Sequence, residues 1–519
     1  MDIITKQFEM SQLGRMIGNQ FMVDEDYNVP DSRQDVKRII MAEGSLLIDE
    51  MKTAEKNLRV KGKMEFQILY ETDDSVPMFS SLEGRIPFDE MLYLDEESHD
   101  EVILRNHSVD LKVSVIHSRK LRVRAVIDLA VQTEQRKYEE IPTDVNCDCK
   151  IHKKQEKLEL LKLHTSKRDS YRIKEEIMLT GTKESIGSIL WTDISNRKLD
   201  IKLATDQLQL SGELLAFCFY ESPDGKIDWV EQVIPYMGKI DCYGIDETMF
   251  HHVQAELEEV QAEMRMDEDG EMRLIGIEGV LRLVIGIYVE EEVDVLRDMY
   301  SLEHNFVLEA KEVICEKLLL QNHSKCKVME RLSVPELQND VLQICHSKGH
   351  VLVEEMEPRE DGVLVSGVLY LSFLYVKSND DVPFDVWHGM VPFSHLVECG
   401  GDGKNLKYDI FTMLEQLSVT LQGGNEVEVK AVLSFQGFFR KEEIVSKIHS
   451  VQMEPISLEE IEKRPSIVGY VAKEGEDLWN LAKRYRTSVE AIRDVNELGD
   501  RPVKAGDRLL IFKENVSIL

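Results

Sequence analysis

The chain of 519 residues carries 63 Lys and Arg against 97 Asp and Glu, which gives a formal net charge of −34 at pH 7. This charge argues against a sequence-general nucleic-acid binder, which needs a basic surface for the phosphates, and against electrostatic adhesion to an anionic membrane. At this length, with 43% hydrophobic residues, the sequence predicts three or four folded domains.

The start of the chain has no pattern typical of export. Residues 1–9 lack a basic stretch followed by an apolar one. No segment reaches the roughly 18–20 uninterrupted apolar residues that a spanning helix needs. The eight cysteines are scattered and form no disulfide framework. We therefore expect a cytoplasmic protein without direct membrane insertion.

One pattern occurs three times along the chain. Each copy has a glycine after an alternating segment, a tyrosine eight residues later, and further on an apolar residue followed by proline. These landmarks are Gly62, Tyr70 and Pro87 in the first copy, Gly212, Tyr220 and Pro235 in the second, and Gly367, Tyr375 and Pro392 in the third. Chance does not preserve landmarks in one order at one period, so the sequence predicts a triplication.

The residues between the landmarks predict strands. Leu121, Val123 and Ala125, for example, alternate with charged neighbours, the period of two that buries one face of a sheet. Glycine at the close of such a strand indicates a bulge or a close backbone approach. Each tyrosine precedes a turn-rich segment (73–75, 223–225 and 379–381), so a hairpin should follow. We expect the tyrosines to lie in the core, each with a partner for its hydroxyl.

These patterns predict a mainly β protein with three repeated β-rich, sandwich-like domains, at residues 1–150, 165–305 and 325–450. Between the first two copies, residues 150–164 are basic and rich in helix formers. We interpret this segment as a solvated linker helix.

Nothing in the repeats indicates catalysis. Cys147 and Cys149 with His152 could form half of a metal site, but no second ligand pair stands at matching spacing. No histidine recurs at a landmark beside an acid or a nucleophile, and no nucleophile elbow or phosphate-binding glycine loop occurs. The sequence therefore predicts a scaffold without cofactor or metal rather than an enzyme.

The last segment, 467–515, differs from the repeats in its pattern of apolar residues and predicts a strand, two helices and a strand. Residues 468–472 form the first strand, and 478–485 form a helix whose N-cap is Asp477. Thr487 or Ser488 caps the second helix, and Glu490 takes the capping-box position if the cap is Thr487. Residues 503–511 supply a turn and a closing strand. Nine basic and nine acidic residues balance between 466 and 515, so the net charge belongs to the repeats.

This module resembles a LysM domain. The resemblance rests on Gly475-x-x-Leu478-Trp479, Ala482-x-x-Tyr485, Ser488-Val489-x-x-Ile492, Asn496-x-Leu498 and Gly506-x-x-Leu509. In one departure, Asp477 stands where the family usually has threonine or serine, beside the groove that binds N-acetylglucosamine. We expect Leu478, Ala482, Ile492 and Leu498 in the core, and Trp479 either packed or in contact with a partner. The residues assigned to the partner-binding or glycan groove are Gly475, Glu476, Asp477, Leu478, Trp479, Asn496, Leu498, Gly499 and Asp500.

The whole arrangement, three such repeats and one C-terminal LysM, resembles the SipL-type family of clostridial spore-coat morphogenesis proteins, whose repeats are SPOCS domains. The resemblance implies a mother-cell protein at the forespore surface, in the spore coat. It also implies that the LysM module works with the coat-basement ATPase (stage IV sporulation protein A) and other coat proteins. The alternative is a LysM protein that binds peptidoglycan through N-acetylglucosamine.

Overall fold

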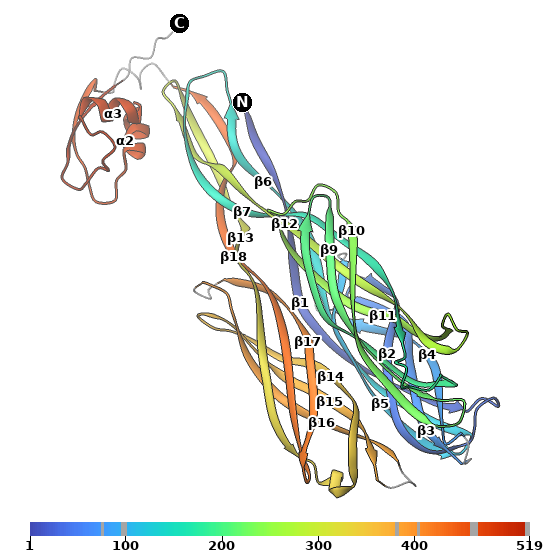
Figure 1. Cartoon of the computed structure of the whole chain (residues 1–519). Coiled ribbons are helices and arrows are strands. Elements are labelled where there is room, and N and C mark those ends of the chain that lie inside the picture. The colour runs from blue at the N-terminus through green and yellow to red at the C-terminus, as the bar shows by residue number, and fades with distance from the viewer. Residues whose placement is uncertain (74–76, 95–100, 379–382, 402–404, 457–464, 514–519) are drawn as a thin grey trace.

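The structure is a computed structural model that describes residues 1–519 except 74–76, 95–100, 379–382, 402–404, 457–464 and 514–519. Strands dominate, and the chain forms an elongated body with the small C-terminal module beside one end (Figure 1). The predicted mainly β class is confirmed. In the described residues no helix is long and apolar enough to cross a membrane.

Each repeat consists of two three-stranded antiparallel sheets. In the first repeat one sheet has the order β1-β6-β5 and the other β2-β3-β4. The bounds are β1 Asp2–Asn28, β2 Val36–Ala54, β3 Asn57–Thr72, β4 Phe79–Tyr93, β5 Glu101–His117 and β6 Lys120–Asn146. Alternate residues of the two sheets, among them Leu58, Phe66, Val123 and Ile127, meet in one hydrophobic core.

The other two repeats follow the same plan, with the sheet orders β11-β12-β7 and β10-β9-β8, then β13-β18-β17 and β14-β15-β16. The second repeat contains β7 Ile151–Met178, β8 Ser188–Ala204, β9 Gln207–Glu221, β10 Ile227–Asp241, β11 Phe250–Met266 and β12 Met272–Ser301. The third contains β13 His304–Ser333, the 3-10 helix η1 Pro335–Asp340, β14 Val341–Pro358, β15 Gly362–Lys377, β16 Phe384–Glu398, β17 Leu406–Gly423 and β18 Glu426–Pro455.

The linker helix predicted at 150–164 is wrong, because this segment is the first half of β7. Leu160, Leu161 and Leu163 are buried, and the strand pairs with β12 along its length. Lys, Glu, Gln and Leu are good helix formers, but intrinsic propensity is a weak preference, and pairing with a strand more than a hundred residues away outweighs it.

The landmark glycines lie within continuous strands rather than at their ends. Gly62 and Gly367 sit where a neighbouring strand comes close, whereas a Cβ on Gly212 would meet the ring of Tyr236. A Cβ on Gly62 would lie 2.4 Å from the carbonyl oxygen of Leu47, and one on Gly367 would lie 2.2 Å from that of Leu352. In both repeats the partner strand has a register shift beside the glycine. The expected bulge and close backbone approach are therefore confirmed at both positions.

All three landmark tyrosines are buried as predicted, and the predicted hydroxyl partner is found for Tyr70 and Tyr220. Tyr70 is buried and its hydroxyl donates to the carbonyl oxygen of Gln34 at 3.1 Å, while Tyr220 reaches that of Glu184 at 3.5 Å. The expected hairpins β3–β4, β9–β10 and β15–β16 follow. A described turn occupies 223–225, whereas residues 74–75 and 379–381 of the other two expected turns lie outside the described residues.

The three repeats pack on one another around a shared interior. Leu69, Phe219 and Leu374 each stand seven residues after the landmark glycine, and all three belong to one buried cluster with Trp191 and Phe384. Equivalent sheets of the three copies therefore face a common centre.

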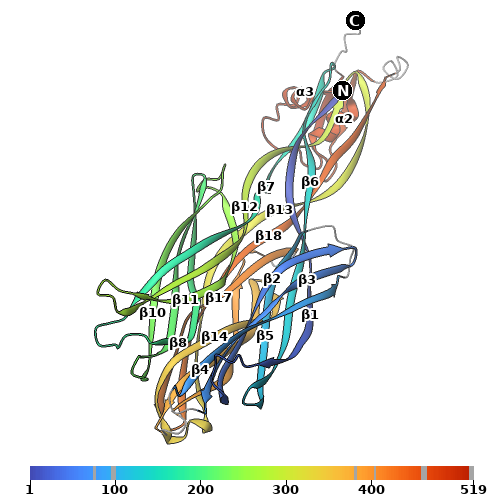
Figure 2. The ribbon, with the colours of Figure 1, turned by 90° about the vertical axis from the view of Figure 1, so that its right-hand side faces the viewer.

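At one end the longest strands extend beyond the sandwiches as three ribbons, β1–β6, β7–β12 and β13–β18. Side chains of all three ribbons form shared clusters there, made of Phe8, Ile141, Leu160, Val293, Val313 and Val445, and nearer the tip of Val145, Leu296, Met299 and Ile448. We call these six strand ends the stalk. Figures 1 and 2 show the stalk with the N-terminus and the C-terminal module at its tip.

Candidate functional site

The C-terminal module has the predicted order of strand, two helices and strand. Its elements are β19 Ile467–Val471, α2 Leu478–Tyr485, α3 Val489–Val495 and β20 Arg508–Phe512, and β19 pairs antiparallel with β20. The four side chains predicted in its core are buried: Leu478, Ala482, Ile492 and Leu498.

Both helix caps come from the predicted residues. The Asp477 carboxylate accepts from the backbone N–H of Asn480 at 2.8 Å and caps α2. The Ser488 hydroxyl accepts from the N–H of Ala491 at 3.1 Å and caps α3. Ser488 rather than Thr487 is therefore the second cap, and Glu490 does not take the capping-box position.

The loop between β19 and α2 is held by its own carboxylate. Glu476 accepts from the hydroxyl of Tyr470 at 2.7 Å and from the backbone N–H of Lys473 at 3.0 Å, and it forms an ion pair with Arg484 at 3.2 Å. The hydrogen bond from Tyr470 is the main cause that lowers the pKa of Glu476. The Glu476 side chain therefore stabilises the loop. The backbone turns at Gly475, whose φ of 79° favours glycine.

The carboxylate of Asp477 also reaches outside the module. It pairs with Lys154 of β7 at 3.0 Å. Burial opposes ionisation of Asp477, but the hydrogen bond from Asn480 and the nearby Lys154 lower its pKa. Asp477, which stands where LysM domains usually have threonine or serine, thus links the module to the second repeat.

Trp479 faces the stalk. Its indole Nε1 donates to Asp298 Oδ2 at 2.7 Å, and its ring meets that of Tyr300 edge to face at 4.9 Å between centroids. Lys483, on the same side of α2, donates to Asp298 Oδ1 at 2.6 Å. Trp479 therefore both packs and makes a polar contact, and its partner belongs to the same chain.

More bonds reach the turn between β12 and β13. The hydroxyl of Tyr300 donates to the carbonyl oxygen of Thr487 at 2.8 Å. Arg486 donates to the carbonyl oxygens of Ser301 and His304, each at 3.2 Å. Tyr300 and Leu302 also join the hydrophobic core of the module. We call this contact of α2 and its flanking residues with Lys154, Asp298 and 300–304 the LysM dock.

The second groove loop is partly structural. Asn496 donates to the carbonyl oxygen of Leu510 and accepts from its N–H, both at 2.7 Å, which ties the end of α3 to β20. Gly499 has φ 56°, and its carbonyl oxygen accepts from Arg493. Asp500 is fully exposed and lies 3.5 Å from Arg493. Of this loop, residues 499 and 500 face solvent, whereas Leu498 lies in the core.

The sequence indicated none of the stalk residues of the dock. Asp298 is 181 residues from Trp479, and the motif that identified the module ends within the module. The one weak signal of this contact in the sequence is Tyr300, which stands beside a break in the apolar alternation at the end of β12.

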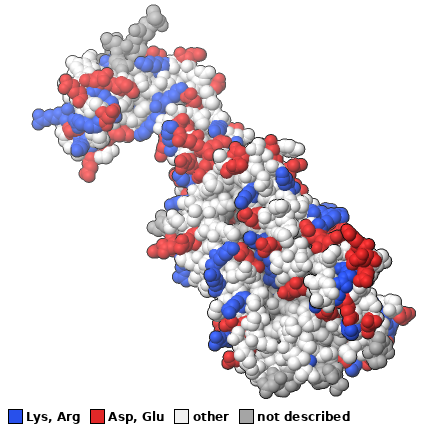
Figure 3. Space-filling model, viewed as in Figure 1, with Lys and Arg blue, Asp and Glu red and all other residues white. Residues whose placement is uncertain are grey.

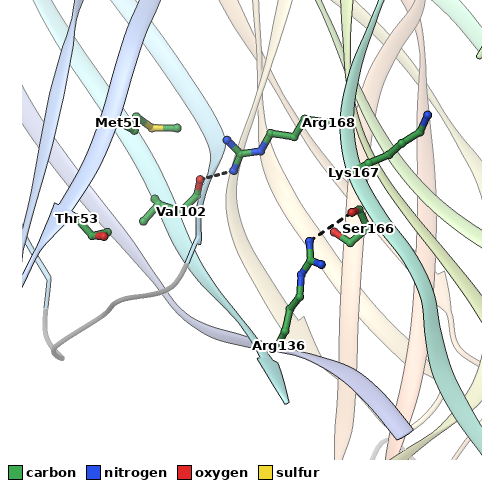
Figure 4. A pocket seen from close by; sticks show the side chains of 7 residues that line it. All are labelled: Met51, Thr53, Val102, Arg136, Ser166, Lys167 and Arg168. Carbon is green, nitrogen blue, oxygen red and sulfur yellow. Dashed lines mark hydrogen bonds between the residues drawn. The ribbon is translucent and has the colours of Figure 1, made fainter. Parts of the chain in front are cut away.

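A cavity of about 350 Å³ lies between the first and second repeats (Figure 4). Met51, Thr53, Val102, Arg136, Ser166, Lys167 and Arg168 line it. Arg168 donates to the carbonyl oxygen of Val102 at 2.7 Å, and Arg136 donates to that of Ser166 at 3.3 Å. These cations hold the two repeats together. Across the described part of the chain, no three His, Cys, Asp or Glu side chains gather as metal ligands.

Comparison with known protein families finds the SipL, SPOCS domain at residues 35–118, 185–265 and 340–422, and a LysM domain at 470–512. The chain has a SipL-type domain architecture. The three SPOCS segments span β2–β5, β8–β11 and β14–β17, so the six strands that build the stalk lie outside them. No curated protein and no solved structure matches the chain.

Proposed function

We propose that this protein is a non-enzymatic scaffold of spore-coat assembly. Its three SPOCS repeats form the body, and its LysM module docks on the coat-basement ATPase, stage IV sporulation protein A. We place it in the mother-cell cytoplasm at the forespore surface, together with other coat proteins. The observation that carries the proposal is the combination of three SPOCS segments and one LysM domain in a single chain.

The loop 475–477 favours a protein partner over a sugar. A neutral sugar is held by free hydrogen-bond donors and acceptors in a groove. Here both carboxylates of the loop are engaged, Glu476 by Tyr470 and Arg484, and Asp477 by Asn480 and Lys154. The loop also lies against the stalk, which restricts the access of a sugar to the loop.

The outer face of the β19–β20 sheet stays open. Ile467 and Val471 on β19 and Leu510 and Phe512 on β20 are all at least two-fifths exposed. Their strands pair directly, so these side chains form one apolar surface. Contiguous exposed apolar side chains mark protein contacts. On the face shown in Figure 3, acidic and basic side chains mix on the module.

A pull-down of the full-length protein with the coat ATPase of the same organism tests the proposal. We expect binding, and we expect Leu510→Glu to weaken it at least tenfold. Met237→Glu is the control, because Met237 is a highly exposed apolar side chain far from the module, on β10. Absence of binding by the unmodified protein contradicts the proposal. In sporulating cells, removal of the residues after Arg464 should abolish a fluorescent ring around the forespore.

The alternative function is peptidoglycan binding, which the LysM match itself favours. Sedimentation of the full-length protein with purified peptidoglycan, compared with Asp477→Thr, separates the two. Strong pelleting of the unmodified protein without a protein partner supports the alternative. Pelleting only after Asp477→Thr indicates that the carboxylate and its bond to Lys154 close the groove.

A further inference from the structure

The bend that joins β6 to β7 contains two cysteines separated by one residue. The Sγ atoms of Cys147 and Cys149 lie 2.9 Å apart, and both side chains are partly exposed. Of the other six cysteines five are buried, and Cys326, on β13, is partly exposed. Among the described residues, the pair is therefore the one place where two accessible thiols touch.

The two thiols are chemically unequal. The hydrogen bond from Cys149 lowers the pKa of Cys147, whereas burial and the neighbouring Cys147 raise the pKa of Cys149 to about 11. At neutral pH Cys147 thus carries more thiolate, and Cys149 holds its proton. Since the thiolate is the attacking species in thiol–disulfide exchange, Cys147 is the nucleophile of the pair.

We propose that Cys147 and Cys149 form a reversible dithiol–disulfide site, oxidised by a low-molecular-weight disulfide such as oxidised glutathione. The Cys147 thiolate attacks one glutathione sulfur, the glutathione S–S bond breaks, and one glutathione leaves and takes a proton. Cys149 then loses its proton to solvent and attacks Cys147 Sγ, and the second glutathione leaves. Two thiols become one disulfide, and one oxidised glutathione becomes two reduced molecules.

The geometry needs little change for this bond. The sulfurs must approach by less than about 1 Å to reach a disulfide length of about 2.05 Å. The bend 147–150 lies between the strands, so closure breaks no ladder hydrogen bond of β6 or β7. A ring closed by cysteines this near in sequence is strained, and strained disulfides are the labile ones. The short approach of the sulfurs favours closure of the ring, and its strain makes the bond readily reduced.

The site lies at the joint that holds the LysM module. The Ser301 hydroxyl donates to the carbonyl oxygen of Lys150 at 2.9 Å, and Arg486 of the module donates to that of Ser301 at 3.2 Å. One residue therefore links the bend to the LysM dock. Oxidation closes a ring beside this contact, where repeats one and two and the module meet.

The test uses the full-length protein, equilibrated in glutathione buffers of increasing oxidised fraction. Free thiols are then alkylated, the protein is digested, and the peptide masses are measured by mass spectrometry. In oxidising buffers we expect the peptide with Cys147 and Cys149 to escape alkylation and to be two hydrogens lighter than the dithiol peptide. Dithiothreitol should restore the alkylated form. Complete alkylation of both residues in every buffer overturns the proposal, and so does glutathione attached without a Cys147–Cys149 bond.

Three variants test the assigned roles. Cys149→Ser should accumulate one glutathione on Cys147, because the second attack is lost. Cys147→Ser should leave Cys149 largely as the thiol. Cys326→Ser is the matched control and should leave oxidation of the pair unchanged. Equal glutathione labelling in the first two variants contradicts the assignment of Cys147 as nucleophile.

Discussion

Neutralising Asp298 should release the LysM module from the stalk. Its carboxylate, at 22% side-chain exposure, accepts from Trp479 Nε1 at 2.7 Å and from Lys483 Nζ at 2.6 Å. In Asp298→Asn the side chain keeps its size but loses its charge and one acceptor. Trp479, Lys483 and the backbone N–H of Met299, which donates to Asp298 Oδ1 at 2.8 Å, then compete for a single amide oxygen.

The size of the effect follows from these two bonds. A hydrogen bond to a charged group contributes about 1.5–3 kcal/mol. Lys483 is 37% exposed, so water screens its ion pair and the second bond counts for much less. We expect Asp298→Asn to cost about 2 kcal/mol of docking free energy. That cost shifts the ratio of docked to released module by about thirtyfold.

Hydrogen exchange on the full chain measures this shift. Amides of α2 and of residues 300–304 should exchange faster in Asp298→Asn than in the unmodified protein. The control is Asp294→Asn, which removes the same charge from an exposed position on β12. If the two variants exchange alike, the polar bonds do not hold the dock, and its apolar contacts with Tyr300 and Leu302 suffice.

Three more predictions concern the body. Arg440 is buried between Glu316 at 2.8 Å and Asp409 at 2.7 Å, so Arg440→Met should cost about 3–5 kcal/mol in denaturant unfolding; a loss below about 1 kcal/mol contradicts the buried network. Burial opposes protonation of His346, but its hydrogen bonds to Asp193 and Glu231 raise its pKa. The stability from this shift is complete below the unfolded pKa of about 6.5 and is lost as pH rises through the folded pKa. The melting-temperature advantage of the unmodified protein over His346→Gln should therefore shrink with rising pH, and a constant difference refutes the assignment. Gly367→Ala places a Cβ 2.2 Å from the carbonyl oxygen of Leu352 and should cost about 1–3 kcal/mol, whereas Gly18→Ala, with nothing within 4 Å, should cost far less.

Local signals in the sequence predicted the parts of the fold that depend on neighbouring residues. The alternation around Val123, the glycine before each hairpin and the cap at Asp477 all have causes within a few positions. The segment 150–164 could not be assigned in this way, because its strand form depends on β12. Likewise, the sequence motif placed Trp479 beside a groove, but only the fold brings Asp298 to it.

The centre of the body explains why the three copies are not interchangeable. Glu43, Asp193 and Lys348 occupy the same position in their repeats, each paired with the residue five after the landmark glycine. Three like charges at such a position would repel one another. Instead, Lys348 bonds Glu43 at 2.6 Å and Asp193 at 3.0 Å, so one cation of the third copy joins both other copies.

This contact also limits which surfaces are open to the partners of the proposed scaffold. The inner sheets of the three repeats are closed by one another, as the shared cluster of Leu69, Phe219 and Leu374 shows. Partners must therefore meet the outer faces of the body or the LysM module. The body carries the acidic excess, whereas the module is balanced in charge and presents the open β19–β20 face. Like-charged bodies repel at low salt, so the proposed scaffold would gather copies through the module without bringing their acidic faces together.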